Sequence, residues 1–399
     1  MQITDYLVIG AGIVGLTIAR ELQRRDPVAK VMVIDKEHKL GMHASGRNSG
    51  VLHSGIYYPS DTLKARFTRE GNQAWQAYCE EKNLPIDRCG KLIVARNAKE
   101  HEQLQTLEQR GTANGVEVQR LDLQQTRDLE PRAKTFKEAL FVPSTATANP
   151  LQLLAAQQED FIQAGGILKL DCSYRRKEAG NLVLAGQERI SAGKVINCAG
   201  LYADKVAHDF GFGLQYTLLP FKGLYHYASR DAQPPSCHIY PAPNLKHPFL
   251  GVHFTRTLDG RTKIGPTAIP ALWREHYGGF SGFDAKELAE VVGRELHMLA
   301  TNQNQFRSLA WQEIRKYHRQ NMIDDAATLM DGTKAMAFNE AGRPGIRAQL
   351  VERRTNTLVM DFVVEGDEHS THVLNAISPA WTCAIPFAQH VVNQCFKSY

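Results

Sequence analysis

Long apolar runs are absent from this sequence. Its longest weakly polar stretch, residues 6–19, contains three glycines, and it is shorter than the roughly 20 apolar residues that a bilayer-spanning helix needs. The first five residues carry no positive charge, and no small-residue cleavage site follows them, so we expect no secretory signal. The sequence therefore predicts a protein with neither a spanning helix nor a leader.

Paired cysteines are absent as well. The chain has seven cysteines, an odd number, and no two of them form a C-x-x-C pair. This disfavours a disulfide framework and a cysteine zinc site, and it makes the reducing cytoplasm the expected location. We predict no metal site.

Concentrated charge is also missing. Lysine and arginine together number 47 and aspartate and glutamate 42, which gives a net charge of +5. The densest basic clusters are pairs such as Arg24-Arg25, whereas a nucleic-acid-binding protein gathers Lys and Arg on one face. We therefore expect no nucleic-acid partner. An anionic substrate, an anionic cofactor and an anionic membrane surface are all compatible with this charge.

The opening segment has the most informative pattern in the chain. Residues 5–10 form a short apolar run typical of a strand, residues 13–25 have the apolar spacing of a helix, and residues 31–34 predict a second strand. In a chain of 399 residues, of which 43% are hydrophobic, this strand–turn–helix–strand order predicts an α/β domain within a protein of two or three units.

The turn of this unit carries a phosphate-binding pattern. Gly10, Gly12 and Gly15 form G-x-G-x-x-G, and Asp35 follows the last glycine by 20 residues. The first glycine permits a tight turn, the second lets the backbone approach a pyrophosphate, and the third lets the helix pack against the strand. The helix N-terminus then faces the phosphates, and Asp35 accepts hydrogen bonds from a ribose. The spacing predicts a site for NAD or FAD.

A glycine-rich stretch after Asp35 favours FAD over NAD as the ligand. Residues 44–59 are rich in glycine and small hydroxyl residues and show neither helical nor strand periodicity. Such a stretch indicates backbone laid against a ligand. A buried strand at 193–198 ends in Ala199-Gly200, far from the first strand in sequence. We therefore expect the nucleotide-binding domain to be discontinuous.

The remaining chain is predicted to mix helices with an antiparallel sheet. Strand-like runs separated by Pro and Gly favour such a sheet between residues 214 and 275. The further expected elements are helices at 62–83, 99–114, 150–164, 286–300, 303–312 and 382–396, and strands at 91–95, 167–170, 224–227, 238–240, 249–254, 262–265, 357–364 and 371–377.

Several motifs together resemble a known family. They are G-A-G-I-V-G at 10–15, S-G-R-N-S-G-V-L-H-S-G-I-Y-Y-P at 45–59, I-N-C-A-G-L at 196–201 and N-A-I-S-P-A-W-T at 375–382. The set resembles the D-amino-acid-oxidase-like FAD oxidoreductases. G-K-L-I-V at 90–94, F-L-G-V-H-F-T at 249–255 and G-I-R-A-Q at 345–349 make it most similar to the L-2-hydroxyglutarate dehydrogenase/oxidase family.

The resemblance implies an α/β fold with two domains. One is a Rossmann-like FAD-binding domain of the glutathione-reductase type, and the other is an α+β substrate domain built on an antiparallel sheet. The boundaries we expect are residues 1–80, 145–213 and 335–399 for the FAD-binding domain and residues 81–144 and 214–334 for the substrate-binding domain.

The resemblance also implies which residues hold the cofactor, FAD. The glycine turn cradles the pyrophosphate, the small residues after Asp35 follow the phosphates and the ribityl chain, and the start of the C-terminal helix closes over the flavin. The residues are Gly10, Gly12, Gly15, Asp35, Lys36, Ser45, Arg47, Asn48, Ser49, Ala199, Gly200, Ser378, Pro379 and Thr382. Pro379 is expected in the first turn of that helix.

The implied reaction is oxidation of L-2-hydroxyglutarate, or a closely related 2-hydroxy acid, to the 2-oxo acid. A hydride leaves C2 for flavin N5, and electrons pass to a quinone or another acceptor. The alternative keeps the fold and makes the protein an amino-acid or amine oxidase that uses oxygen. A non-catalytic FAD-binding protein is the third interpretation.

The reaction needs a base of near-neutral pKa beside the hydroxyl, for which histidine is the natural choice. His53, in the glycine-rich stretch, is the leading candidate. Covalent attachment to the flavin and a backbone-bonded loop histidine are its alternatives. His253 alternates with apolar neighbours on a strand and is the second candidate, either as a base/orienter partner of His53 or as a buried structural residue.

The reaction also needs cations for the substrate carboxylates, for which the arginine fork is best suited. Arg347 resembles the family's arginine and is our predicted clamp, with a solvated surface arginine as the alternative. Lys222 is predicted to neutralise reduced flavin or hold the distal carboxylate, or to be structural. Tyr57, Tyr225, Tyr240 and Arg256 are further candidates for substrate contacts. We expect a small dicarboxylate as partner, and a cytoplasmic protein that associates with the inner membrane at most peripherally.

Overall fold

The computed structural model describes residues 1–244, 251–302 and 306–396. The chain divides into two units, and each is built from more than one stretch of sequence. Unit 1 comprises Met1–Asn48, Pro150–Pro220 and Arg347–Tyr399, and unit 2 comprises Ser49–Asn149 and Phe221–Ile346.

The division differs from the expected domains mainly at residues 49–80. We expected them in the FAD-binding domain, whereas they lie in unit 2. Strand β3 (Val51–Leu52) pairs with β8 (Ala146–Ala148). The side-chain amide of Asn72, in helix α2 (Leu63–Glu81), donates hydrogen bonds to the carbonyl of Leu52 in β3 and to that of Ser144, just before β8. These long-range contacts hold the segment to unit 2.

Unit 1 is built on a mainly parallel sheet. Its main path runs β10-β11-β12-β1-β2-β9, and β22 pairs with β12 and β21. The strands are β1 (Gln2–Ile9), β2 (Val31–Ile34), β9 (Ile167–Lys169), β10 (Tyr174–Lys177), β11 (Leu182–Ala185), β12 (Glu188–Asn197), β21 (Val364–Gly366) and β22 (Ser370–Val373). Strand β1 is parallel to both β12 and β2, which is the arrangement of a Rossmann-like unit.

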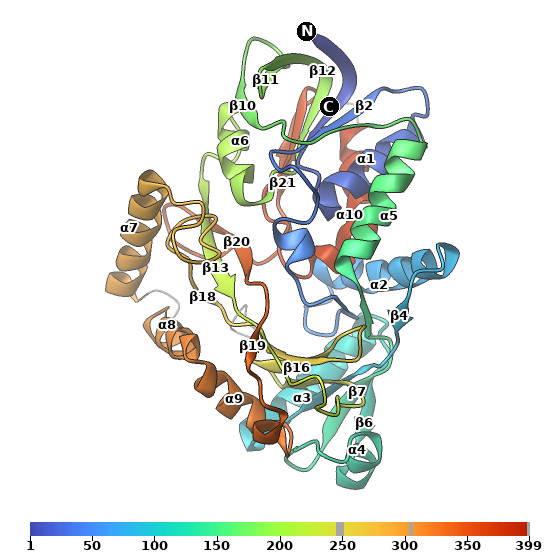
Figure 1. The fold of residues 1–399 in the computed structure, drawn as a ribbon, viewed down its shortest axis with the longest axis vertical. Helices are drawn as coiled ribbons and strands as arrows, with labels where there is room; N and C mark the ends of the chain where they lie inside the picture. The colour runs from blue at the N-terminus through green and yellow to red at the C-terminus, as the bar shows by residue number, and fades with distance from the viewer. Residues whose placement is uncertain (245–250, 303–305, 397–399) are drawn as a thin grey trace. The chain divides into compact units, whose positions relative to one another are not determined.

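Helices cover both faces of this sheet. Helix α1 (Ile13–Arg25) packs against α10 (Ala380–Cys395) and α5 (Pro150–Gln163) on one face, and α6 (Ala203–Asp209) contacts β10, β12 and β22 on the other (Figure 1). The strands between them are apolar on both faces, as a doubly covered parallel sheet requires. The predicted helix at residues 13–25 is confirmed to the residue.

The predicted strand at 357–364 is wrong. This segment forms one isolated bridge, between Val351 and Leu358, and only its last residue, Val364, lies in a strand, β21. Backbone and side chains share its hydrogen bonds: the N–H of Val359 donates to Leu350, and the amides of Gln349 and Asn375 donate to the carbonyl of Val359. The apolar residues that suggested a strand are packed against the side of unit 1 instead.

Unit 2 contains an eight-stranded sheet. Its order is β19-β14-β17-β16-β15-β5-β7-β6. The strands are β5 (Lys91–Val94), β6 (Gln119–Leu121), β7 (Ala139–Val142), β14 (His226–Tyr227), β15 (His238–Pro241), β16 (His253–Arg256), β17 (Thr262–Gly265) and β19 (Glu340–Ala341). Every neighbouring pair is antiparallel except β15 and β5. The predicted antiparallel sheet is therefore confirmed, although β5, β6, β7 and β19 join it from outside residues 214–275.

Two helices sandwich this sheet. Helix α9 (Arg319–Ala327) packs Met322, Ile323 and Ala326 onto one face. Helix α3 (Ala98–Ala113) packs Leu104 and Leu107 onto the opposite face near β5 and β7. Residues on the two faces alternate along each strand, so β5, β7 and β15 contribute to both cores.

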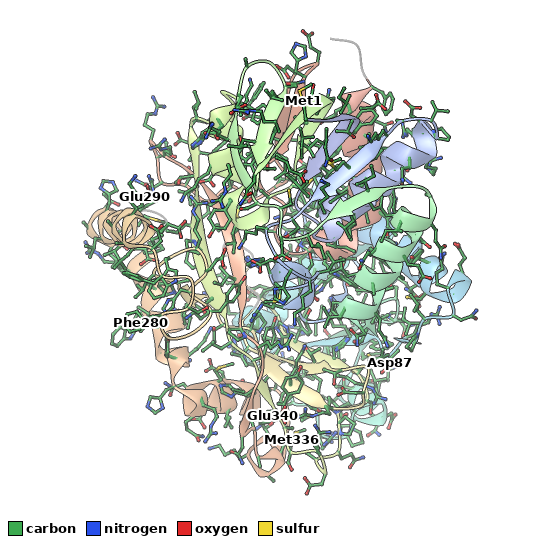
Figure 2. The ribbon with its side chains drawn as sticks, turned by 45° about the horizontal axis from the view of Figure 1, so that its top comes forward. Met1, Asp87, Phe280, Glu290, Met336 and Glu340 are labelled. Carbon is green, nitrogen blue, oxygen red and sulfur yellow. The ribbon has the colours of Figure 1, made fainter. Side chains whose placement is uncertain are left out.

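The remaining elements of unit 2 surround the sandwich. Helices α4 (Leu123–Leu129), α7 (Ala285–Thr301) and α8 (Phe306–Ile314), and strands β4 (Ile86–Asp87) and β18 (Ile269–Pro270), complete the unit. Strands β13 (Tyr216–Gly223) and β20 (Gly345–Glu352) run from one unit into the other. Phe280, in the segment before α7, is 83% exposed at the periphery (Figure 2).

Two predicted elements fall partly on residues that the structure does not describe. The expected strand at 249–254 includes residues 249 and 250, and the expected helix at 303–312 includes residues 303–305. The described parts of these segments enter β16 and α8. No helix among the described residues is long and apolar enough to cross a lipid bilayer. The seven cysteines are free thiols.

Candidate functional site

The glycine turn between β1 and α1 leaves no room for side chains. A Cβ on Gly15 would lie 1.9 Å from the carbonyl oxygen of Gly10, and a Cβ on Gly10, whose φ is +107°, would lie 2.4 Å from that of Cys198. Gly12 is the N-cap residue of α1 and has no side chain with which to cap it. The helix N-terminus therefore offers backbone N–H groups to an anionic ligand, as a pyrophosphate requires.

Two side chains hold this turn in place. Asp35, directly after β2, accepts the N–H of Ala11 at Oδ2 (2.7 Å) and that of Glu37 at Oδ1 (2.9 Å). Ser45 Oγ accepts the N–H of Ile13 at 2.9 Å. A carboxylate has about four lone-pair sites, so Asp35 keeps acceptor capacity for the hydroxyls of a ribose.

The carboxyl edge of the unit 1 sheet brings the other predicted cofactor residues near this turn. The N–H of Cys198 donates to the carbonyl of Ile9 at 2.9 Å, which places Ala199 and Gly200 beside the end of β1. Ligands of open parallel sheets bind outside the carboxyl ends of the strands. The backbone N–H groups of the turn and its glycines, which leave space for a ligand, therefore fit an FAD pyrophosphate, and Asp35 fits the ribose.

Polar residues after Asp35 form bonds within their own segment. Lys36 pairs with Glu37 at 2.7 Å. Arg47 Nε donates to the carbonyl of Met42 at 2.5 Å, and the Asn48 amide donates to the carbonyls of Ala44 and Ser45. These bonds order the segment in unit 1. Ser49, the next residue, belongs to unit 2.

The start of the C-terminal helix differs slightly from the prediction. Helix α10 begins at Ala380, so Pro379 occupies the cap position and not the first turn. Ser378 is exposed and Thr382 is buried in the first turn. The N-cap residue, Pro379, supplies no side-chain cap, and the helix start is a positive helix end in unit 1.

In unit 2, one face of the eight-stranded sheet carries buried polar side chains. Lys91 pairs in register with His238, Ile93 with Tyr240, Ile239 with Phe254, and Thr255 with Lys263. Paired residues point to the same face. The polar face therefore contains Lys91, His238, Tyr240, His253, Thr255 and Lys263, whereas the face behind it contains Leu92, Val94, Ile239, Phe254 and Ile264.

His238 on this face is structural. Its Nδ1 accepts the N–H of Arg256 at 3.2 Å, so the ring proton lies on Nε2, which is 2.9 Å from Thr147 Oγ1. Burial, with a smaller contribution from Lys91, lowers the pKa of His238 to about 3. Both ring nitrogens are thus partnered by the protein in the neutral state.

His253 has one ring nitrogen committed to the backbone. Its Nδ1 lies 2.9 Å from the carbonyl oxygen of Gly251, so the proton is on Nδ1 and Nε2 carries a lone pair. The ring stacks on Tyr240 with centroids 3.7 Å apart and 16° between the planes. Burial lowers the pKa of His253 to about 3. The geometry is that of a fixed, neutral proton acceptor.

The loop that carries His53 and Tyr57 is irregular but firmly held. Asn114, at the C-terminus of α3, donates to the carbonyls of Gly55 (2.9 Å) and Tyr58 (3.0 Å), and Arg110 donates to that of Tyr57 (2.7 Å). Burial, followed by the charges of Lys91, His253 and His238, places the pKa of His53 well below its ordinary value. His53 is therefore neutral near pH 7.

Lys91, like His238, Thr255 and Lys263, is a residue of this face that the sequence analysis missed. Its side chain is fully buried, with Nζ 4.5 Å from the ring centre of Tyr57 and 5.4 Å from that of Tyr240. Burial alone lowers its pKa to about 7. The signal was present in the strand Lys-Leu-Ile-Val, where alternation puts Lys91 opposite the apolar face.

The cationic candidates have different surroundings. Lys222 of β13 is buried in unit 2, which lowers its pKa. Arg256 points away from His253 along β16 and forms an ion pair with Asp87 (Nε–Oδ2 2.7 Å; Asp87 is marked in Figure 2), so we leave it out of the substrate site. Arg347 is half-buried in β20 and belongs to unit 1.

Comparisons with known proteins agree with this geometry. Residues 5–394 match the family model described as FAD dependent oxidoreductase. The chain belongs to this family. As a member, it is an FAD-dependent oxidoreductase, and the glycine turn of unit 1 is where the family's cofactor fits the residues present.

Individual relatives indicate which members of the family the chain is similar to over nearly its full length. The chain is 35% identical to the mitochondrial L-2-hydroxyglutarate dehydrogenase of Mus musculus, covering 98% of this chain and 88% of the relative. It is 33% identical to that of Nematostella vectensis (99% and 91%) and 31% identical to the L-2-hydroxyglutarate dehydrogenase of Escherichia coli strain K12 (98% and 92%).

Solved structures share the fold of this FAD-dependent oxidoreductase. An FAD-bound L-alpha-glycerophosphate oxidase from Mycoplasma pneumoniae aligns with a TM-score of 0.78 at 21% identity, covering 100% of this chain and 96% of that one. A glycine oxidase from Geobacillus kaustophilus aligns with a TM-score of 0.74 at 16% identity and the same coverage.

Proposed function

We propose that this FAD-dependent oxidoreductase oxidises L-2-hydroxyglutarate, or a closely related 2-hydroxy acid, to the 2-oxo acid. The observation that carries the proposal is the pair of neutral histidines in unit 2, His53 and His253, on or beside a sheet face that also holds buried lysines. Oxidation of an alcohol needs a proton acceptor, and an acidic substrate needs cations. The names of relatives 31–35% identical to the chain support the choice of substrate.

FAD, when bound, supplies the acceptor for the two electrons. Gly10, Gly12 and Gly15 with Asp35 would hold its pyrophosphate and ribose through the turn described above. The same proposal extends to the other predicted cofactor residues, namely Lys36, Ser45, Arg47, Asn48, Ser49, Ala199, Gly200, Ser378, Pro379 and Thr382.

The two histidines have different proposed roles in the reaction. His53 is less buried than His253 and lies in a loop that α3 holds rigid, so we propose that it takes the hydroxyl proton. His253, oriented by Gly251 and Tyr240, lies close enough to lower the pKa of His53. It is the proposed orienter, while burial is the main reason that His53 stays unprotonated before the reaction.

Arg347 is the proposed carboxylate clamp, and it gives the first quantitative prediction. Loss of a buried charge-assisted contact typically costs about 2–5 kcal/mol of binding free energy. We therefore expect Arg347→Ala to raise KM at least tenfold, measured by steady-state turnover with an artificial electron acceptor. Arg353→Ala, a change at a nearby exposed arginine of unit 1, is the matched control. An unchanged KM in Arg347→Ala would remove this residue from the site.

An anaerobic flavin-bleaching screen tests the proposed function. The FAD-loaded enzyme is mixed with L-2-hydroxyglutarate, its D-enantiomer, L-lactate, glycine, sarcosine or glycerol 3-phosphate, and absorbance of the oxidised flavin is followed. We expect rapid bleaching by L-2-hydroxyglutarate. Bleaching by glycine or sarcosine alone would instead assign the protein to the amine-oxidising alternative.

We further propose that the electrons leave for a quinone or another acceptor other than oxygen, at a peripheral position on the inner membrane. The designation of the relatives as dehydrogenases supports the acceptor. Turnover should be faster with a water-soluble quinone analogue than with dissolved oxygen. Co-sedimentation with anionic vesicles tests the location, and recovery of all the protein in the supernatant would count against it.

A further inference from the structure

Three buried polar atoms without a hydrogen-bond partner belong to side chains that lie against the polar face of the unit 2 sheet. They are Lys91 Nζ and the hydroxyls of Tyr57 and Tyr240; within the described part of the chain none forms a hydrogen bond of good geometry, although Thr255 lies close enough to the Tyr240 hydroxyl to lower its pKa. All three atoms are buried. The Lys91 ammonium position lies over both tyrosine rings, at 4.5 and 5.4 Å from their centres. The side chains that carry the three unpartnered atoms therefore form one cluster.

Such a cluster destabilises the fold unless something else binds to it. Each buried polar group without a hydrogen bond costs folding free energy, and a cation over aromatic rings recovers only the part that concerns the ammonium, not the hydroxyls. Methionine at position 91 and phenylalanine at positions 57 and 240 would fill the same space without this loss. Unsatisfied buried groups gathered at one point indicate a binding site.

The surroundings of Lys91 specify the charge of the ligand. Of the groups packed around it, Tyr57 and Tyr240 have pKa values raised by burial, and His53, His238 and His253 are neutral. On the neighbouring strand β7, the residue paired with Lys91 is the apolar Val142. Lys263 of β17 adds a second amine to the same face of the sheet. No acidic side chain of the described residues shifts the pKa of Lys91, for which burial is the sole cause.

The counterion must therefore come from outside the protein. We propose that Lys91, Tyr57 and Tyr240 form a carboxylate-binding subsite, in which Lys91 takes up a proton when the substrate's carboxylate arrives. The two phenolic hydroxyls donate to the carboxylate oxygens, and the ammonium neutralises it. The identity of the diacid rests on the proposed function, whereas the subsite itself rests on these three residues.

A titration with glutarate tests the subsite without turnover. Glutarate has both carboxylates of the proposed substrate and no hydroxyl to oxidise. Its binding to the FAD-loaded enzyme is measured calorimetrically at pH 8 in phosphate and in Tris, whose ionisation enthalpies differ. Because Lys91 has a pKa of about 7 in the empty site, we expect uptake of close to one proton per glutarate bound.

Variants at Lys91 make the result specific. Lys91→Met should bind glutarate at least tenfold more weakly and take up no proton, and Lys91→Arg, already charged, should bind without uptake. Tyr57→Phe and Tyr240→Phe preserve shape and should weaken binding several-fold; they keep the proposal testable if Lys91 variants fold poorly. Undiminished binding in Lys91→Met and both tyrosine variants, judged on protein with full flavin content, would overturn the proposal.

Lys263 provides the matched comparison. It is a second buried lysine of the same face, over the rings of Tyr225 and Tyr227, and burial lowers its pKa to about 8. Proton uptake should survive in Lys263→Met. If uptake disappears in Lys263→Met and persists in Lys91→Met, the subsite belongs to Lys263 and our assignment is wrong.

Turnover then identifies which carboxylate is bound. KM is compared for L-2-hydroxyglutarate and L-2-hydroxybutyrate, which lacks the distal carboxylate. A rise in KM for the diacid alone in Lys91→Met assigns the distal carboxylate, and a rise for both assigns the carboxylate at C1; unchanged KM for both would overturn the subsite. If neither acid bleaches the flavin, the proposed function fails, while the glutarate titration still decides on Lys91.

Discussion

Replacement of His53 by alanine should lower kcat by about 100-fold or more while the protein stays yellow. A general base that accepts a proton in the transition state contributes roughly 100- to 10,000-fold to the rate, and water is a poor substitute in a buried site. The measurement is the rate of flavin bleaching in anaerobic stopped-flow mixing with saturating L-2-hydroxyglutarate. Bound flavin, read from the same spectrum, serves as the folding control.

His253→Ala is the informative companion variant. Its Nε2 also carries a lone pair, so the larger loss of kcat identifies the proton acceptor. We expect the larger loss at His53 and a smaller loss at His253. Near-normal bleaching in both variants would contradict proton abstraction by this pair and favour the amine-oxidising alternative, which uses a neutral substrate amine.

The pH dependence of kcat follows from the same pKa shifts. A base works only when unprotonated, and the pKa of His53 lies well below 6.5 because burial and neighbouring positive charge disfavour the imidazolium. The rate should therefore not fall as pH drops through 6.5, and its acidic limb should appear only at lower pH. A limb centred near pH 6.5 would indicate a solvated histidine instead.

Replacement of Gly15 by alanine should abolish FAD binding. The new Cβ would lie 1.9 Å from the carbonyl oxygen of Gly10, a contact that forces α1 away from β1 and opens the turn that faces the pyrophosphate. Purified Gly15→Ala should be colourless and less stable to denaturant. Flavin content after reconstitution with excess FAD and the unfolding midpoint are the two measurements.

Gly293 offers a matched control within another helix. It lies inside α7, and a Cβ there would meet nothing within 4 Å. Gly293→Ala should keep its flavin and gain up to about 1 kcal/mol in stability, because alanine is the better helix former. Full flavin retention in Gly15→Ala would show that the helix can shift without damage to the cofactor turn.

The cofactor unit was predictable from sequence because its signal is local. Gly10, Gly12, Gly15 and Asp35 lie within 26 residues, and strand, turn and helix each have their own periodicity. The structure adds bonds that no spacing shows, such as the one from the Ala11 N–H to Asp35. The strand expected at 357–364 failed because isolated backbone bonds and the side-chain amides of Gln349 and Asn375, not a regular strand partner, satisfy most of its backbone groups that the structure shows bonded.

The substrate face was harder to predict because it is assembled over long separations. Lys91 lies beside His238 only because β5 joins the sheet between β15 and β7. The alternation of side chains along a strand indicates that Lys91 and Leu92 face opposite ways. It does not indicate which of the two faces packs into a hydrophobic core and which carries the polar groups. For the same reason Arg256 was a candidate, although it lies one residue out of phase with His253 and Thr255.

The alternation of the unit 2 sheet has an evolutionary consequence. Residues such as Leu92 and Phe254 pack under α9, while their neighbours along the same strands, such as Lys91 and His253, face the opposite way. A mutation on the reactive side therefore leaves the supporting hydrocarbon layer untouched. Selection can exchange one chemistry for another there at little risk to folding, so this sheet is a natural starting point for redesigning substrate preference in the laboratory.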